Sequence, residues 1–149
     1  MSITRLYGFY IDMQISKNMV HLGEYNYFER MVTMEHTVVD AKRIEAVSER
    51  VRQAAIDTLG DRLDKVYLYD VNEWGYDGPD FCFLIVADIA ESEAGDEHSK
   101  IRNRLAHVVL EYDVLFCCGV TGTERFNKYK NVMPTFKSAI NEGTLLYGR

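Results

Sequence analysis

The sequence predicts a mixed α/β domain, a sheet with flanking helices. Apolar residues recur at helical spacing between Val38 and Leu59 and again between Ile101 and Val109. Three short apolar runs have the composition of buried strands, and they lie at 65–69, 81–87 and 113–118. Helical and strand patterns are interleaved along the chain, which is typical of a layered α/β domain.

Composition and charge narrow the classes of function. The chain has 149 residues, about the size of one domain, and a formal net charge of −6. This charge argues against broad nucleic-acid binding, but not against a small nucleotide held through metal ions. The sequence has no apolar run long enough to span a membrane, and its first residues do not have the layout of a secretion signal. We therefore expect a cytoplasmic protein that binds no membrane.

The first third of the chain predicts an extension followed by a long helix. The segments 6–15 and 20–28 are rich in aromatic and β-branched residues, and they favour a β-hairpin within an N-terminal extension, residues 1–36. An exposed edge that carries Tyr7, Phe9, Tyr10 and Ile11 would pair with a second copy, so we expect a homodimer through this segment. From Thr37, a plausible N-cap, a helix runs to Gly60, which ends it, and opens the main domain at 37–149.

The remaining elements follow in order. The run at 65–69 predicts a strand, residues 70–80 a loop, and the fully apolar run at 81–87 a central strand. Since this loop is too short for a crossover helix, the two strands should pair antiparallel. The further expectations are an acidic loop at 88–95, a helix around 101–109, a strand at 113–118, a turn at 119–122, helices at 123–130 and 134–141, and a last strand at 144–147.

The three cysteines predict free thiols. An odd number of cysteines without a secretion signal is typical of a reducing compartment. Cys117 and Cys118 are adjacent, so on a strand their side chains point to opposite faces and cannot share one metal ion. A zinc site is disfavoured, and small buried apolar residues are the preferred interpretation.

Several segments together resemble one known family. They are Val66–Tyr69, Pro79–Val86, Tyr112–Phe116 and the ending Ile140–Tyr147. In this order they are similar to the small nucleotidyltransferase domains of the DNA polymerase beta superfamily, over residues 40–149. The resemblance implies a nucleotidyltransferase-like fold. In that family a strand ends in Gly-Ser, and an Asp-x-Asp pair and a third acid hold two Mg²⁺ ions over a nucleoside triphosphate.

The resemblance assigns a role to each matching position. Asp80 and Asp113 match the first and third acids and would be the catalytic residues. Cys82 stands at the second acid position, so Asp80, Cys82 and Asp113 would be the metal-binding set for Mg²⁺. Asp70 and Val71 replace Gly-Ser, and Gly75 matches a glycine of the following turn; these three are the positions expected to contact the nucleotide.

The departures from the family pattern predict a degenerate active site. Mg²⁺ prefers oxygen ligands, so the Cys82 thiol is a poor substitute for a carboxylate. A carboxylate at Asp70 about 4 Å from a phosphate costs roughly 4 kcal/mol at an effective dielectric of about 20. We expect a protein that binds a nucleoside triphosphate or a protein partner, with weak or no transfer activity.

Other interpretations stay open. The chain could be an active Mg²⁺-dependent enzyme that moves a nucleoside monophosphate to a hydroxyl on a protein or small molecule. It could also be a purely structural interaction module. Asp70, Asp77 and Asp80 could form a rearranged acid cluster, or could be turn-forming residues.

Overall fold

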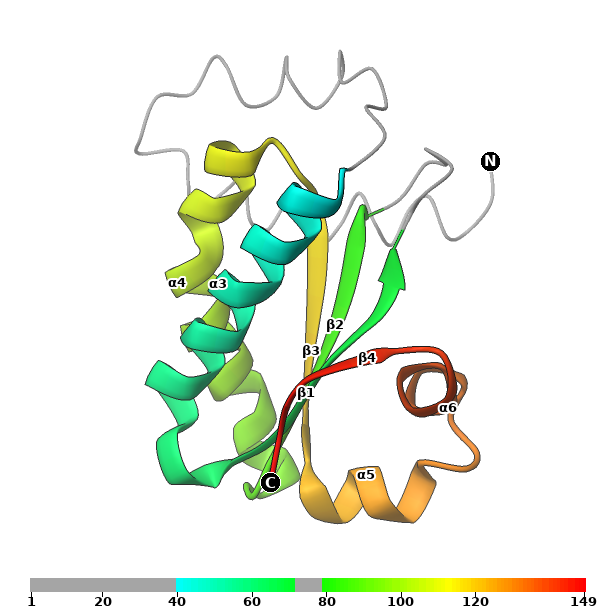
Figure 1. Ribbon diagram of the computed structural model, residues 1–149. Helices are drawn as coiled ribbons and strands as arrows, with labels where there is room; N and C mark the ends of the chain where they lie inside the picture. Colours follow the sequence, from blue (N-terminus) through cyan, green and yellow to red (C-terminus); the bar gives the residue numbers. More distant parts are fainter. Residues whose placement is uncertain (1–39, 72–78) are drawn as a thin grey trace, which may run out of the picture.

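Four strands form one mixed sheet in the computed structural model, which describes residues 40–71 and 79–149 (Figure 1). The strand order is β3-β2-β1-β4. β1 pairs antiparallel with both β2 and β4, whereas β2 and β3 are parallel. The antiparallel pairing predicted for the first two apolar runs is therefore confirmed. The strands are β1 (Leu63–Val71), β2 (Phe81–Ala87), β3 (Phe116–Gly122) and β4 (Thr144–Gly148).

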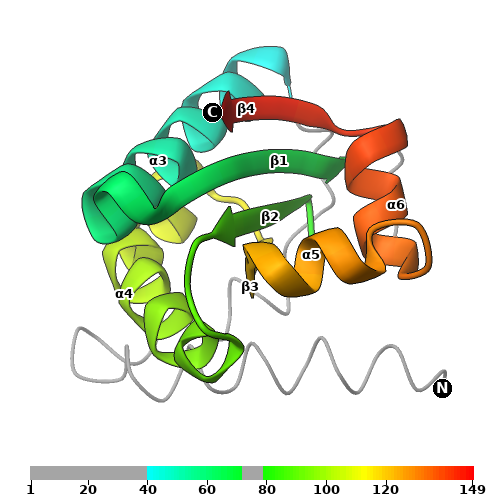
Figure 2. The same ribbon diagram turned by 90° about the horizontal axis from the view of Figure 1, so that it is seen from below.

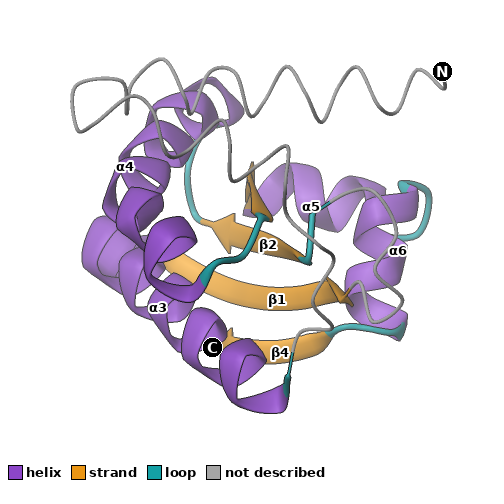
Figure 3. Cartoon of the chain, turned by 90° about the horizontal axis from the view of Figure 1, so that it is seen from above, coloured by secondary structure: helices purple, strands orange, loops and turns teal. Residues whose placement is uncertain are grey.

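Helices cover both faces of this sheet. α3 (Ala41–Leu59) and α4 (Ala94–Tyr112) lie together on one face (Figures 1 and 3). The shorter helices α5 (Thr123–Tyr129) and α6 (Pro134–Asn141) lie on the other face (Figure 2). The structure thus confirms a mixed sheet with flanking helices.

Alternation along β2 divides the hydrophobic residues into two cores. Phe81, Phe83 and Ile85 pack with α3 and α4 in the larger core. Leu84 and Val86 point the other way, into a smaller core built with α5 and α6. Every residue of β2 is buried, as expected for a strand with a layer on each side.

The ends of α3 are set by two capping residues. The helix begins at Ala41, and the carboxylate of its N-cap, Asp40, accepts a hydrogen bond from the Arg43 N–H at 2.8 Å. The predicted N-cap at Thr37 is therefore wrong; Asp40 satisfies the free N–H of the first turn instead. Gly60 ends the helix with φ +53°, a conformation that favours glycine, so the predicted stop is confirmed.

The predicted boundaries of the third strand are wrong. α4 continues through Tyr112, and β3 begins only at Phe116 and includes the segment predicted as a turn at 119–122. The reason is pairing, because β3 matches β2 residue by residue from Phe81↔Phe116 to Ala87↔Gly122. A continuous partner strand outweighs the low strand preference of Gly119 and Gly122.

The segment before α4 also differs from the prediction. Residues 88–95 are not all loop, since a short 3₁₀ helix at Glu91–Glu93 leads directly into α4. The helices predicted after β3 are confirmed, including the start at Pro134.

The predicted hairpin and pairing edge of residues 1–36 lie outside the described residues. Within the described ranges, no helix combines the length and the apolar character needed to cross a membrane.

Candidate functional site

A row of three residues crosses the sheet and includes two of the predicted site residues, Asp70 and Cys82. Asp70 on β1 is the register partner of Cys82 on β2, and Cys82 is the register partner of Cys117 on β3. The register of β1 shifts between Leu68 and Asp70, so the strand is irregular there. Side chains from three strands are thereby brought side by side near the beginnings of β2 and β3.

Cys82, Cys117 and Tyr69 form a polar contact group on this row. The two thiols influence the pKa of each other, and Tyr69 influences the pKa of both. Cys82 is 8% exposed, and Cys117 is more exposed than Cys82. Tyr69 also packs against the smaller core, so the group lies on the α5 and α6 face of the sheet.

Cys118 lies on the opposite face from this group. It packs against the larger core below α3 and α4. The prediction that Cys117 and Cys118 point to opposite faces is confirmed, because both lie on β3. Burial raises the pKa of the Cys118 thiol. Cys118 therefore does not face Cys82, whereas Cys117 is the register partner of Cys82.

The electrostatics of the pair are asymmetric. The hydrogen bond with Cys82 lowers the pKa of the Cys117 thiol, and a second hydrogen bond with Tyr69 adds to this effect. The hydrogen bond with Cys117 and burial both raise the pKa of Cys82. Burial also raises the pKa of Tyr69. Burial of Cys117 acts in the opposite direction on its pKa, and the charge of Asp70 raises the pKa of both thiols.

Asp80 lies directly before β2 and is engaged with the backbone. Its Oδ2 accepts a hydrogen bond from the Leu115 N–H at 2.7 Å, and its own N–H donates to the Leu115 carbonyl oxygen at 2.6 Å. The Phe81 N–H reaches the same carbonyl oxygen at 3.3 Å. These contacts join the start of β2 to the segment that leads into β3.

Asp113 lies at the end of a helix rather than at the start of a strand. It is the C-cap of α4 in the left-handed conformation, with φ +53° and ψ +51°, and it is exposed. Asp is one of the few residues apart from glycine that adopt this conformation readily. The expectation that Asp113 begins the third strand is therefore wrong, because β3 starts three residues later, at Phe116.

The positions predicted to contact a nucleotide are Asp70, Val71 and Gly75. Asp70 is exposed near the end of β1, and Val71 is the last residue of that strand, paired with Phe81. Gly75 and Asp77 lie outside the described residues. The sequence-based set missed Tyr69 and Cys117. Only the register of β3 on β2 shows that Cys117 lies beside Cys82, and the predicted strand boundary did not give that register.

The described side chains of this row do not fit Mg²⁺. Over residues 40–71 and 79–149, no three or more His, Cys, Asp or Glu side chains are grouped so as to hold a metal ion. Two of the three side chains in the row are thiols, and Mg²⁺ is bound by oxygen ligands. One Asp80 oxygen already accepts the Leu115 N–H. We therefore assign no reaction step to a metal ion at this row.

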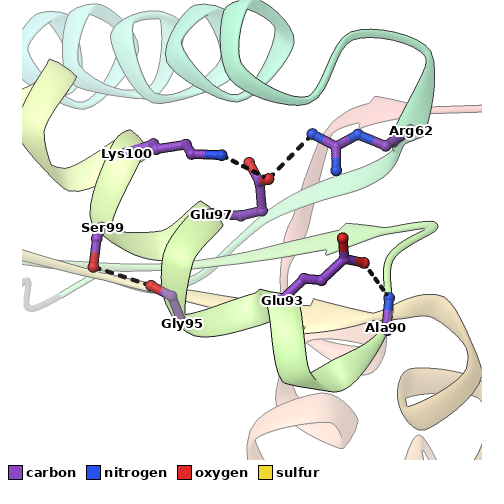
Figure 4. A network of polar contacts seen from close by, with 7 residues as sticks. All are labelled: Arg62, Ala90, Glu93, Gly95, Glu97, Ser99 and Lys100. Atoms are coloured by element: carbon purple, nitrogen blue, oxygen red, sulfur yellow. Dashed lines mark hydrogen bonds and ion pairs between the residues drawn. The ribbon is translucent and has the colours of Figure 1, made fainter.

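A second polar cluster lies on the other side of the sheet, in the first turns of α4. The Glu97 side chain is 6% exposed and accepts hydrogen bonds from Arg62 at 3.2 Å and Lys100 at 3.0 Å. Figure 4 shows Arg62 and Lys100 reaching the Glu97 carboxylate from opposite sides. Two cations offset one buried carboxylate, so this cluster joins α4 to the segment before β1 and is structural.

Comparisons with known proteins give no further assignment. No family model matches the chain, and neither a curated protein nor a solved structure matches it. The evidence for the mixed sheet with flanking helices is therefore the structure itself.

Proposed function

We propose that this chain is a nucleotidyltransferase-like protein that transfers no nucleotide and acts by binding, with a protein as its partner. The order of elements supports the likeness: a helix, two antiparallel strands, a helix, and a strand parallel to the second. Three of the segments on which the resemblance rests include strand residues of β1, β2 and β4, whereas only Phe116 of the segment Tyr112–Phe116 belongs to β3.

One observation carries the loss of transfer activity: the thiols of Cys82 and Cys117 are neighbours where carboxylates would be needed. Acids that hold the same pair of metal ions must lie close to one another. Cys82 occupies the second acid position, and its register partner on β3 is Cys117. The third candidate, Asp113, caps α4 before β3 begins. Without a set of hard oxygen ligands, a triphosphate has no metal ion to orient it or to stabilise the leaving pyrophosphate.

Charge favours a protein over a nucleoside triphosphate as the ligand. Asp70 is exposed in the same row, and the whole chain carries a formal net charge of −6. A triphosphate approaching this row would be repelled unless a cation neutralised it. A protein surface can present positive charge and apolar groups together, and so can complement the row.

Calorimetry tests the loss of nucleotide chemistry. ATP and GTP are titrated into the full chain in Mg²⁺, and the titration is repeated in EDTA. We expect no heat of binding up to millimolar nucleotide in either buffer. Micromolar binding that disappears in EDTA would contradict the proposal, because it would show that a metal–nucleotide site assembles.

Purification from the native cells tests the partner. We expect the tagged chain to recover one protein in near-stoichiometric amount, with no nucleotide released after acid precipitation. Copurification of a stoichiometric nucleotide without a protein would overturn the assignment of a protein ligand. The same preparation of an Asp70→Lys variant shows whether the charge of this row takes part in recognition.

A further inference from the structure

The thiol pair of β2 and β3 has a chemistry of its own, separate from any binding function. We propose that Cys82 and Cys117 are a thiol-modification site, at which a small-molecule disulfide oxidises the pair to a reversible cross-strand disulfide. This inference does not depend on the proposed function, because it needs only the two side chains and their positions.

Geometry supports the bond. Register partners on neighbouring strands have their side chains on the same face, with the strands about 4.8 Å apart. The Cα separation in disulfides is about 4.4–6.8 Å, a range that includes the spacing of neighbouring strands. Cys82 and Cys117 are such register partners, and no residue lies between them in the sheet. Cys118 is excluded from the reaction because it faces the larger core on the other side of the sheet.

Access decides the order of attack. Cys117 is the more exposed of the two thiols, and Cys82 is 8% exposed. The Cys117 thiolate attacks one sulfur of the oxidant, forms a mixed disulfide and releases one small thiol. Cys82 then loses its proton and attacks the Cys117 sulfur, which releases the second small thiol. Two protein thiols are oxidised and one small disulfide is reduced to two thiols.

Strand spacing also predicts that the bond is easily reduced. The Cβ atoms of a disulfide lie about 3.8 Å apart, which is closer than neighbouring strands bring side-by-side residues. Drawing β2 and β3 together at this pair costs strain energy, and strained disulfides are the reducible ones. We therefore expect the site to equilibrate with the thiol pool rather than to remain oxidised.

The test uses the full, reduced chain and oxidised glutathione as the probe. After treatment, the remaining thiols are blocked with a maleimide in denaturant, and the intact mass is measured. The chain has three cysteines, so the reduced protein takes up three maleimides. We expect one maleimide after oxidation, a tryptic cross-link between peptides 66–100 and 105–125, and the loss of this cross-link in dithiothreitol.

Matched variants identify the second sulfur, because Cys117 and Cys118 lie in the same peptide. Cys118→Ser should keep the cross-link, and Cys117→Ser should lose it. Three maleimides on the oxidised wild-type chain, a glutathione adduct that stays on Cys117, or a cross-link that survives in Cys117→Ser would each overturn the proposal. The wild-type experiment stands by itself if a variant fails to fold.

Discussion

The carboxylate of Asp80 accepts a hydrogen bond from the Leu115 N–H at 2.7 Å, and the Asp80 N–H donates to the Leu115 carbonyl oxygen at 2.6 Å. This reciprocal pair joins residues 35 positions apart in the chain. It holds the start of β2 against the segment that enters β3, where the two strands begin to run in parallel. Asp80 therefore has a structural role at a position that the sequence pattern assigns to catalysis.

Removing the Asp80 acceptor should destabilise the fold. Asp80→Ala leaves the Leu115 N–H without this partner, and we expect the free energy of unfolding to fall by about 1–3 kcal/mol. Asp80→Asn retains a carbonyl oxygen and should lose less. Urea unfolding followed by circular dichroism measures both variants. An unchanged midpoint for Asp80→Ala would show that the hydrogen bond contributes nothing to stability.

Replacing the C-cap of α4 should stabilise the protein. Asp113 has φ +53°, which glycine adopts without steric cost, and it places a negative charge at the negative end of a helix dipole. We expect Asp113→Gly to raise the free energy of unfolding by about 0.5–1 kcal/mol. Asp113→Val is the matched control and should lower it, because a β-branched residue is strained in this conformation. The account of this cap fails if the two variants are equally stable in urea.

Glu97 should make stability depend on pH in the acid range. Burial raises the pKa of Glu97, but hydrogen bonds from Lys100 and Arg62 and their charges outweigh burial, so the pKa lies below its ordinary value of 4.5. A lowered pKa stabilises the folded state above pH 4.5, and this stability is lost as the pH falls through the folded-state pKa.

Unfolding curves between pH 7 and pH 3 test this dependence. We expect Glu97→Gln to be less stable than wild type at pH 7 and to lose less stability on acidification. Glu45→Gln removes one charge from an exposed position of α3 and serves as the control. Parallel pH curves for wild type and Glu97→Gln would contradict the assigned role of Glu97.

Two glycines should respond to alanine in opposite directions. A Cβ at Gly143 would meet the carbonyl oxygen of Ala139 and lie 3.0 Å from that of Leu68, and backbone atoms cannot move aside cheaply. We expect Gly143→Ala to cost about 1–3 kcal/mol of stability. Gly95 lies in the first turn of α4 with open space around it, so Gly95→Ala should gain about 0.5–1 kcal/mol. Thermal unfolding of the two variants would contradict this account if both midpoints moved the same way.

Much of the fold is predictable because local patterns and pairing agree. The apolar run of β2, the glycine that ends α3 and the proline that starts α6 each specify their element without help from distant residues. The boundary of β3 is different. Val114 and Leu115 have the composition of a strand, yet they precede β3 and belong to no strand. Gly119 and Gly122 have the composition of a turn, yet they pair with β2.

The candidate site is less predictable than the fold for the same reason. Which residue of β3 lies beside Cys82 depends on strand register, and register is decided by tertiary packing rather than by local sequence. The misplaced strand made Asp113 the third site residue and left Cys117 unassigned. That Asp70, Cys82 and Cys117 lie in one row is known only from the register of the three strands.

Counting bound Mn²⁺ tests the central claim most directly, since Mn²⁺ replaces Mg²⁺ at oxygen sites and its free form is visible by electron paramagnetic resonance. The ion is titrated with the full chain, with and without ATP. The account predicts that the protein leaves the spectra of free Mn²⁺ and of the Mn²⁺–ATP complex unchanged. Binding of one or two Mn²⁺ ions per chain in the presence of ATP would contradict it.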